Sequence, residues 1–364
     1  MAEIKKILIA NRGEIVQRAV RTIREMGKKS VAVYSAGDKN ASYLKHADEA
    51  VCIGGAKSKD SYLNIPAIIT AAEMTGCDAI FPGYGFLSEN QDFVEICRLH
   101  NIKFIGPSVE VMEKMADKSK AKEEMIRAGV PVVPGSKGAV HSVTEGKKVA
   151  LEIGYPIMAK AAAGGGGRGM RLIHDESEFD QLFMAASSEA LAAFGDGTMY
   201  LERFINNPRH IEVQVVGDSH GNAIHIGERD CSLQRRHQKV IEESPAILLN
   251  DETRAKLHDV AVKATKYLKY EGAGTFEFLA DDKQNIFFME MNTRLQVEHP
   301  VSEMVSGIDI VELMIKVAEG EKVPPQESIK FKGHAIECRI TAEDPNSFLP
   351  SPGKVTQWMV PGGR

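Results

Sequence analysis

Residues 271–300 read EGAGTFEFLADDKQNIFFMEMNTRLQVEHP, and the fold is decided by this stretch. Alternating apolar and polar residues predict two strands, Gly274–Ala280 and Ile286–Asn292. The short polar segment Asp281–Asn285 between them is typical of a hairpin loop. We therefore expect an antiparallel hairpin here, with one face carrying the chemistry and the other facing a core.

Closing this hairpin symmetrically about its loop predicts its register. The facing pairs would be Glu277 with Glu290, Thr275 with Asn292, and Leu279 with Phe288. Side chains alternate across a strand, so the hairpin has two different faces. The polar face would carry Glu277, Glu290, Asn292 and Arg294. The apolar face would carry Phe276, Phe278, Phe287, Met289 and Met291.

Two carboxylates that face each other across a hairpin need a proton or a cation between them. Directly opposed residues have Cβ atoms about 5 Å apart, and like charges there repel. Two carboxylates and an amide, from Glu277, Glu290 and Asn292, suit Mg²⁺ held together with substrate phosphates. The alternative is an exposed hairpin with both carboxylates in water. We favour the metal site because Gln296 and Glu298 extend the polar pattern beyond the hairpin.

Composition limits the class of protein. A chain of 364 residues with 43% hydrophobic and 26% charged residues should form two or three globular domains. A net charge of −5 predicts no nucleic-acid partner. No apolar run approaches the roughly 20 residues of a membrane span, and the N-terminus does not resemble a signal peptide. The five scattered cysteines indicate reduced thiols and a cytoplasmic location, without disulfides or zinc.

The first hundred residues alternate between strand and helix patterns. Strands are predicted at 7–10, 31–34, 50–53, 79–81 and 103–105, and helices at 14–26, 65–75 and 90–100. This alternation is typical of an α/β fold with a doubly wound parallel sheet, whose ligands meet the carboxyl ends of the strands. The loops 11–14 and 82–90 lack the G-x-G-x-x-G pattern, which disfavours a dinucleotide-dependent dehydrogenase.

The rest of the chain is expected to form two further units. A charged helix at 114–128 leads to a small α/β unit with helices at 145–153 and 176–193 and strands at 156–162, 170–173 and 199–204. Mainly antiparallel strands follow at 210–216, 223–229 and 332–340, with helices at 251–268 and 309–319. We expect an N-terminal domain at 1–113, a helical linker at 114–130, a lid at 131–204, and a last unit at 205–364.

The glycine-rich loop Gly164–Gly169 is the second functional motif. Glycines let backbone N–H groups approach phosphate oxygens, and Lys160 on the preceding strand adds a point charge. The alternative is a flexible surface loop, but the flanking apolar strands favour a lid over a nucleotide. The polar segment Glu228–Lys239 is equally consistent with a surface or a site. Within it, Cys231 is better explained as a buried small residue than as a nucleophile.

Together these motifs resemble the ATP-grasp superfamily and, within it, the biotin carboxylases, in particular the biotin carboxylase subunits of bacterial acetyl-CoA carboxylases. The resemblance covers essentially the whole chain and rests on residues 9–15, 83–90, 164–170, 228–239, 290–300 and 333–340. It implies an ATP-grasp architecture and an enzyme in which ATP phosphorylates bicarbonate. The carboxyphosphate so formed would yield CO₂ to N1 of biotin on a biotin carboxyl carrier protein.

The resemblance also implies residue roles. ATP would be contacted by Lys118, Lys160, Gly166, Gly167, Glu202, Ile205, His210, Gln234, His237, Glu277, Leu279 and Glu290. Mg²⁺ or Mn²⁺ would be held by Glu277, Glu290 and Asn292. Bicarbonate would be bound by Lys239, Arg294, Gln296 and the Val297 amide. Glu298 would be the general base, and Arg339 would stabilise the enolate form of biotin.

Several wider expectations follow from the resemblance. Carboxyltransferase subunits would be partners, and the family forms homodimers. Relatives continue beyond Arg364 into sequence that completes the C-terminal sheet and much of the dimer-forming face. Three alternatives remain open: the same module of a pyruvate or acyl-CoA carboxylase, another ATP-grasp ligase, and a nucleotide-binding module without turnover.

Overall fold

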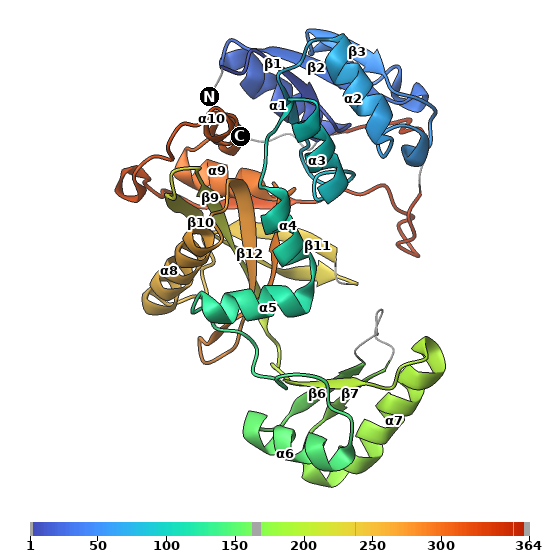
Figure 1. Ribbon diagram of the computed structural model, residues 1–364, viewed down its shortest axis with the longest axis vertical. Coiled ribbons are helices and arrows are strands. Elements are labelled where there is room, and N and C mark those ends of the chain that lie inside the picture. The colour runs from blue at the N-terminus through green and yellow to red at the C-terminus, as the bar shows by residue number, and fades with distance from the viewer. Residues whose placement is uncertain (1–2, 162–168, 237, 352, 360–364) are drawn as a thin grey trace.

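The computed structural model describes residues 3–161, 169–236, 238–351 and 353–359, apart from the side chains of Lys118, Ser119 and Phe194. Three sheets follow one another along the long axis of the molecule (Figure 1). The N-terminal sheet lies at one end, the largest sheet lies in the middle, and the smallest sheet lies with α6 and α7 at the other end. The expected α/β architecture, with a parallel N-terminal sheet and a mainly antiparallel sheet later in the chain, is confirmed. The sheet of the small unit is antiparallel as well.

The N-terminal sheet is parallel and has the strand order β3-β2-β1-β4-β5. Its strands are β1 (Lys6–Ile9), β2 (Lys29–Tyr34), β3 (Glu49–Cys52), β4 (Ala79–Phe81) and β5 (Lys103–Phe104). Its helices are α1 (Glu14–Glu25), α2 (Ile65–Met74) and α3 (Gln91–Leu99). Because Ile7, Leu8 and Ile9 are fully buried, β1 reads as the continuous apolar run typical of a central parallel strand.

One apolar core joins the N-terminal sheet to the middle of the molecule. Helix α1 buries Ile15, Ala19 and Ile23 on one face, at the spacing of successive helical turns. These side chains share a cluster with Leu295 and with residues of α10 (Ile310–Ala318). The N-terminal sheet is thus packed against the segment that follows the hairpin.

The predicted single helix at 114–128 is wrong. Two helices occupy this region, α4 (Val109–Ala116) and α5 (Lys118–Arg127). Asp117 between them has an extended backbone (φ −91°, ψ 119°), and its side chain accepts a 2.9 Å hydrogen bond from the Lys120 amide. Asp117 therefore caps α5, a role that Asp fills more favourably than a position inside a helix.

The small unit contains a three-stranded antiparallel sheet in the order β7-β6-β8. Its elements are α6 (Val143–Ile153), β6 (Ile157–Ala161), β7 (Met170–Ile173), α7 (Glu176–Phe194) and β8 (Met199–Arg203). Phe179 and Phe183 of α7 stack with their ring centroids 5.3 Å apart in a separate apolar core. This small unit therefore has an apolar core of its own.

The middle sheet has six strands in the order β13-β12-β9-β10-β11-β14. These are β9 (Arg209–Gly217), β10 (Ala223–Arg235), β11 (Gln238–Ser244), β12 (Gly272–Ala280), β13 (Ile286–Asn292) and β14 (Ala335–Cys338). Helix α8 (Asp251–Tyr267) contributes to the core on one face of this sheet. Strand β11 is absent from the sequence prediction, and so is helix α9 (His299–Ser306), which follows β13.

The hairpin β12–β13 confirms two of the three predicted facing pairs. Thr275 faces Asn292, and Glu277 faces Glu290. The third pair is wrong, because a bulge between Glu277 and Phe278 shifts the register and Leu279 faces Phe287 instead of Phe288. The Phe288 amide donates a 2.7 Å hydrogen bond to the Pro131 carbonyl, outside the hairpin.

The bulge also changes the composition of the predicted apolar face. Phe276, Phe278 and Met291 are buried as expected. Phe288, rather than Phe287, joins them in the core, and Phe287 and Met289 are only partly buried. A single extra residue in one strand reverses the side-chain alternation beyond it, which explains the exchange. Among the described residues, no helix combines the length and apolar character needed to cross a membrane.

Candidate active site

Four charged residues form a row across the middle sheet. Glu290 on β13 faces Glu277 on β12, Glu277 faces Glu212 on β9, and Glu212 faces Arg229 on β10. Glu212 and Arg229 are fully buried, and Glu277 is 4% exposed. Three adjacent carboxylates repel one another unless cations compensate them. The row therefore requires positive charge from neighbouring elements.

Lys239 on β11 supplies part of this charge. Its ammonium group lies 3.1 Å from Glu277 Oε1 and 2.7 Å from Glu298 Oε1, and it also contacts Glu212. Burial by itself would lower the pKa of Lys239, but the three carboxylates raise it above its ordinary value. Lys239 is therefore a fixed cation at the centre of the site.

His210 supplies a second cation at the same place. Its Nε2 atom lies 3.0 Å from Glu277 Oε2 and 3.2 Å from Glu212 Oε1. Burial would lower the pKa of His210, but these two carboxylates raise it to about 9. Burial would likewise raise the pKa of Glu277, but His210 and Lys239 lower it to about 2. At neutral pH the imidazole is protonated and the Glu277 carboxylate is ionised.

Glu298 is held between two cations. Its Oε1 atom accepts a hydrogen bond from Lys239, and its Oε2 atom accepts a 2.9 Å hydrogen bond from Arg339, just beyond β14. Arg339 also donates a 2.5 Å hydrogen bond to the buried carboxylate of Glu242. Glu298 ends the irregular segment after β13, and Pro300 follows in the first turn of α9, where proline is well tolerated. The start of α9 thus holds the Glu298 carboxylate at the site.

The segment 292–296 extends the site toward the N-terminal sheet. Arg294 donates to Asn292 Oδ1 and to Glu89 Oε2, both at 2.8 Å. Glu89 comes from the loop after β4, one of the two loops singled out in the sequence. The Gln296 amide donates a 2.9 Å hydrogen bond to Glu277 Oε1. The predicted residues Lys239, Glu277, Asn292, Arg294, Gln296, Glu298 and Arg339 are therefore brought together.

Other predicted nucleotide contacts lie around this cluster or in the small unit. Gln234 lies 3.2 Å from Nδ1 of His210, and Leu279 faces His210 on the neighbouring strand. In the small unit, Lys160 forms a 2.5 Å ion pair with Glu202. Ile205 lines a cavity of about 110 Å³ between β8 and the hairpin loop. Gly166, Gly167, His237 and the side chain of Lys118 lie outside the described residues.

Two residues of the row, Glu212 and Arg229, were given no role by sequence reasoning. A signal for Glu212 exists, since His210, Glu212 and Gln214 alternate with buried apolar residues along β9. Strand alternation therefore places Glu212 on the same face as His210. The burial of Arg229 had no local signal, because it depends on β9, β12 and α9 closing around it. Cys231 is buried as expected, and burial raises the pKa of its thiol.

The donor set at β12 and β13 fits a hard divalent cation. Glu277, Glu290 and Asn292 provide carboxylate and amide oxygens from facing positions on two paired strands. Such ligands suit Mg²⁺, which keeps several waters and is shared with substrate phosphates. These three residues are therefore among those that could hold such a cation.

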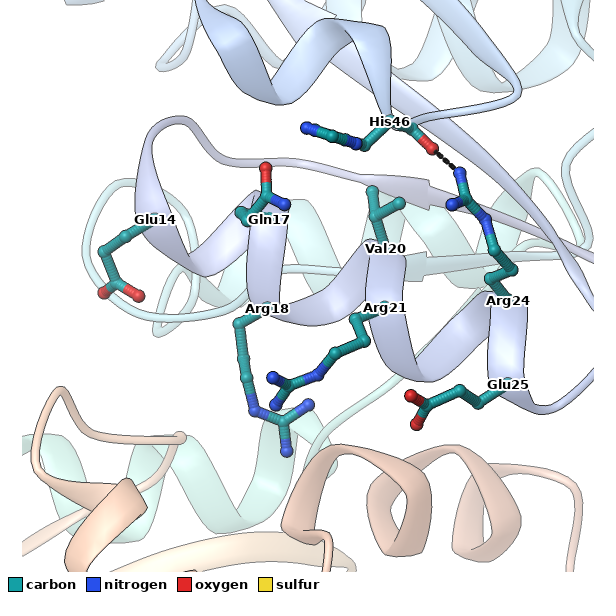
Figure 2. Close-up of a pocket in the computed structure, with 8 residues that line it drawn as sticks. All are labelled: Glu14, Gln17, Arg18, Val20, Arg21, Arg24, Glu25 and His46. Carbon is teal, nitrogen blue, oxygen red and sulfur yellow. Dashed lines mark hydrogen bonds between the residues drawn. The ribbon is translucent and has the colours of Figure 1, made fainter. Parts of the chain in front are cut away.

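A separate groove of about 520 Å³ runs along α1 (Figure 2). On one side of α1, Arg24 donates a hydrogen bond to the His46 carbonyl. Arg18, Arg21 and Glu25 extend from the opposite side of this helix (Figure 2). Arg18 pairs with Glu303 and Asp309 near α9 and α10. None of the residues predicted for catalysis or binding lines this groove, so it is distinct from the charged cluster.

The middle sheet carries the carboxylate cluster, and the sheet of the small unit carries Lys160 on β6. This arrangement matches the ATP-grasp fold of solved biotin carboxylase structures. The family model described as "Biotin carboxylase, N-terminal domain" matches residues 3–112. The model described as "Carbamoyl-phosphate synthase L chain, ATP binding domain" matches residues 117–326.

Three known proteins illustrate the relationship. Biotin carboxylase of Nostoc is 55% identical over 98% of this chain and 80% of its own length. A solved biotin carboxylase from Campylobacter jejuni, in complex with "beta-gamma-ATP", is 68% identical with a TM-score of 0.88, covering all of this chain and 81% of that one. The third protein is the biotin carboxylase domain dimer of Hydrogenobacter thermophilus 2-oxoglutarate carboxylase, solved with MgADP, ADP and bicarbonate. It is 51% identical with a TM-score of 0.85, covering all of this chain and 80% of that one.

The chain belongs to the biotin carboxylase family, whose members are ATP-dependent carboxylating ligases. It spans about 80% of the length of these relatives.

Proposed function

We propose that this chain catalyses the ATP- and bicarbonate-dependent carboxylation of biotin on a biotin carboxyl carrier protein, as the first half-reaction of acetyl-CoA carboxylase. The observation that carries the proposal is the Glu298 carboxylate, 3% exposed in its side chain and held by Lys239 on one oxygen and Arg339 on the other. A buried base between two cations, beside amide and guanidinium donors, suits an anionic substrate that must lose a proton.

We propose that bicarbonate is bound by Lys239, Arg294, Gln296 and the Val297 amide. Glu298 then takes the proton of bicarbonate, and the resulting oxyanion attacks the γ-phosphorus of ATP. The new O–P bond gives carboxyphosphate as the bond to ADP breaks. The pairing of Arg294 with Asn292 and Glu89 orients its guanidinium beside the site. Fixed donors of this kind stabilise charge that grows during transfer.

The second step transfers the carboxyl group to biotin. Carboxyphosphate breaks down to CO₂ and phosphate, and the phosphate takes the proton from N1 of biotin. Arg339 stabilises the negative charge that develops on the ureido oxygen. Arg339 is suited to this role because its Nε and one terminal nitrogen are held by Glu242 and Glu298, which fixes the plane of the guanidinium.

For the nucleotide, we propose contacts from Lys118, Lys160, Gly166, Gly167, Glu202, Ile205, His210, Gln234, His237, Glu277, Leu279 and Glu290. Glu277, Glu290 and Asn292 would hold Mg²⁺ or Mn²⁺, which when bound neutralises phosphate charge during transfer. The fully protonated His210 and Lys239 would keep the Glu277 carboxylate ionised and oriented before substrates arrive. The domain limits 1–113, 114–130, 131–204 and 205–364 are part of the same proposal.

A second candidate is the same reaction as a module of a pyruvate or acyl-CoA carboxylase. The similarity to the solved biotin carboxylase subunit of pyruvate carboxylase supports this second candidate. The two candidates share the chemistry above and differ in the carboxyltransferase that receives carboxybiotin. In either case we propose a homodimer, carrier-protein and carboxyltransferase partners, and a cytoplasmic setting.

The test is ATP hydrolysis by this chain with Mg²⁺ and bicarbonate, with and without free biotin. Phosphate release that requires bicarbonate and is stimulated by biotin is the expected result. A Glu298→Gln variant should lose this activity by about 10²-fold or more while it still binds ATP. ATP hydrolysis that is independent of bicarbonate, in wild type and variant alike, would refute the proposal.

A further inference from the structure

The guanidinium of Arg229 lies fully buried beneath the charged face and has no place in the reaction proposed above. Its Nε and one terminal nitrogen donate to Glu212 Oε2 at 3.1 and 3.0 Å. The same terminal nitrogen also donates to Gln296 Oε1 at 2.8 Å and to Thr275 Oγ1 at 3.2 Å. The other terminal nitrogen donates to Gln214 Oε1 and Ser302 Oγ. Arg229 therefore connects β9, β12, α9 and the segment before α9.

The contact with Gln296 orients its side-chain amide. Because Oε1 of Gln296 accepts from Arg229, the Nε2 group must point the other way, and it donates to Glu277 Oε1. The backbone of Gln296 is held as well, since its carbonyl accepts a 2.8 Å hydrogen bond from the buried His299 ring. With both ends fixed, the amide presents its N–H donors to the active face and not its oxygen.

The contact with Glu212 orients a carboxylate in the same way. Arg229 occupies Oε2 of Glu212, which leaves Oε1 for Lys239 and His210. Burial would raise the pKa of Glu212, but Arg229 above all lowers it. Glu212 thus stays ionised next to Lys239, so the ammonium group is held within reach of Glu298.

We propose that Arg229 is a positioning residue for bicarbonate, which it serves through Gln296 and Glu212 without touching the substrate. The inference rests on the proposed function, because it assigns bicarbonate to the face that Gln296 and Lys239 form. A lysine at this position keeps the charge but lacks the planar fork that holds two acceptors at fixed angles. The loss should therefore appear in bicarbonate binding rather than in nucleotide binding.

Arg254→Lys is the matched control. Arg254 also donates to a buried carboxylate, Glu228 at 2.8 Å, and it also bonds backbone carbonyls. Glu228 precedes Arg229 on β10, so it points to the opposite face of the sheet, toward α8 and away from the charged row. Both variants lose a guanidinium donor to a buried Glu, but only Arg229→Lys affects the site.

The experiment measures bicarbonate-dependent ATP hydrolysis and the KM values for bicarbonate and ATP in wild type, Arg229→Lys and Arg254→Lys. We expect Arg229→Lys to raise the bicarbonate KM by about tenfold or more, with an ATP KM within about twofold of wild type. Arg254→Lys should leave both KM values near wild type. Combining Arg229→Lys with Gln296→Ala should raise the bicarbonate KM by less than the product of the two separate effects.

An unchanged bicarbonate KM in Arg229→Lys, or an equal rise in Arg254→Lys, would overturn the inference. If Arg229→Lys does not fold, the double change Arg229→Met and Glu212→Met removes both buried charges, which proteins tolerate better than the loss of one. The same rise in bicarbonate KM is expected there, and an unchanged value again rejects the inference. Absence of bicarbonate-dependent hydrolysis in wild type would reject the proposed function instead.

Discussion

Replacing His210 by glutamine should destabilise the protein in a pH-dependent way. The pKa of His210 is raised from 6.5 to about 9 by Glu212 and Glu277, against the effect of burial. A folded-state pKa above the unfolded value means that the stabilisation is fully present below pH 6.5 and is lost as the pH rises through 9. This difference in pKa corresponds to a contribution of about 3 kcal/mol to the free energy of unfolding.

The assay is urea unfolding of wild type and His210→Gln at pH 6 and pH 10, with the free energy of unfolding compared at each pH. We expect the variant to be less stable than wild type. The loss of unfolding free energy should be about 3 kcal/mol larger at pH 6 than at pH 10. Other groups that titrate between these values are common to both proteins and cancel in the comparison.

His100→Gln provides the control. His100 lies 2.7 Å from Glu73, but its side chain is 41% exposed, and an ion pair at the surface contributes at most about 1 kcal/mol. Its substitution should therefore change the free energy of unfolding little at either pH. If His210→Gln loses the same stability at pH 6 and pH 10, the imidazole is not held protonated and the electrostatic account of the site is wrong.

Three further predictions concern the metal site, the biotin step and the hairpin register. Glu290→Gln should lower Mg²⁺-dependent turnover by about tenfold or more while ATP affinity changes little, and unchanged turnover would reject the metal assignment. Arg339→Ala should reduce biotin carboxylation about tenfold more than bicarbonate-dependent ATP hydrolysis, and equal losses would count against its role with biotin. Phe288→Ala should cost about 3–5 kcal/mol of unfolding free energy and Phe287→Ala clearly less, whereas the reverse order would contradict the bulge.

The hairpin shows which structural features strand periodicity can predict and which it cannot. Alternation and a polar loop were enough to predict β12, β13 and the facing of Glu277 with Glu290, because these depend on neighbouring residues. The bulge was not predictable in this way, because the Phe288 amide bonds the carbonyl of Pro131, more than 150 residues earlier. A contact from a distant segment thus decided which phenylalanine enters the core.

The N-terminal sheet and the helices also include features that the sequence pattern predicts and features that it does not. The parallel direction of the strands in the N-terminal sheet follows from alternating strand and helix patterns. The structure has the strands where these patterns predict them. The break at Asp117 depended on a choice between two local hydrogen-bonding states of one side chain, helix interior or cap. Helix α9 was missed because its eight residues are too few for a clear period.

For the site, the sequence by itself determined the residue types and the face on which most of them lie. Two carboxylates and an amide at alternating positions of β12 and β13 were enough to indicate a site for Mg²⁺ held together with phosphates. Only the tertiary structure decided how they are paired: Arg294 with Glu89, Arg339 with Glu298, and Glu212 with Arg229. The physical reason is that a strand's pattern is local, whereas its neighbours and the burial of a charge such as Arg229 arise only when separate segments close around it.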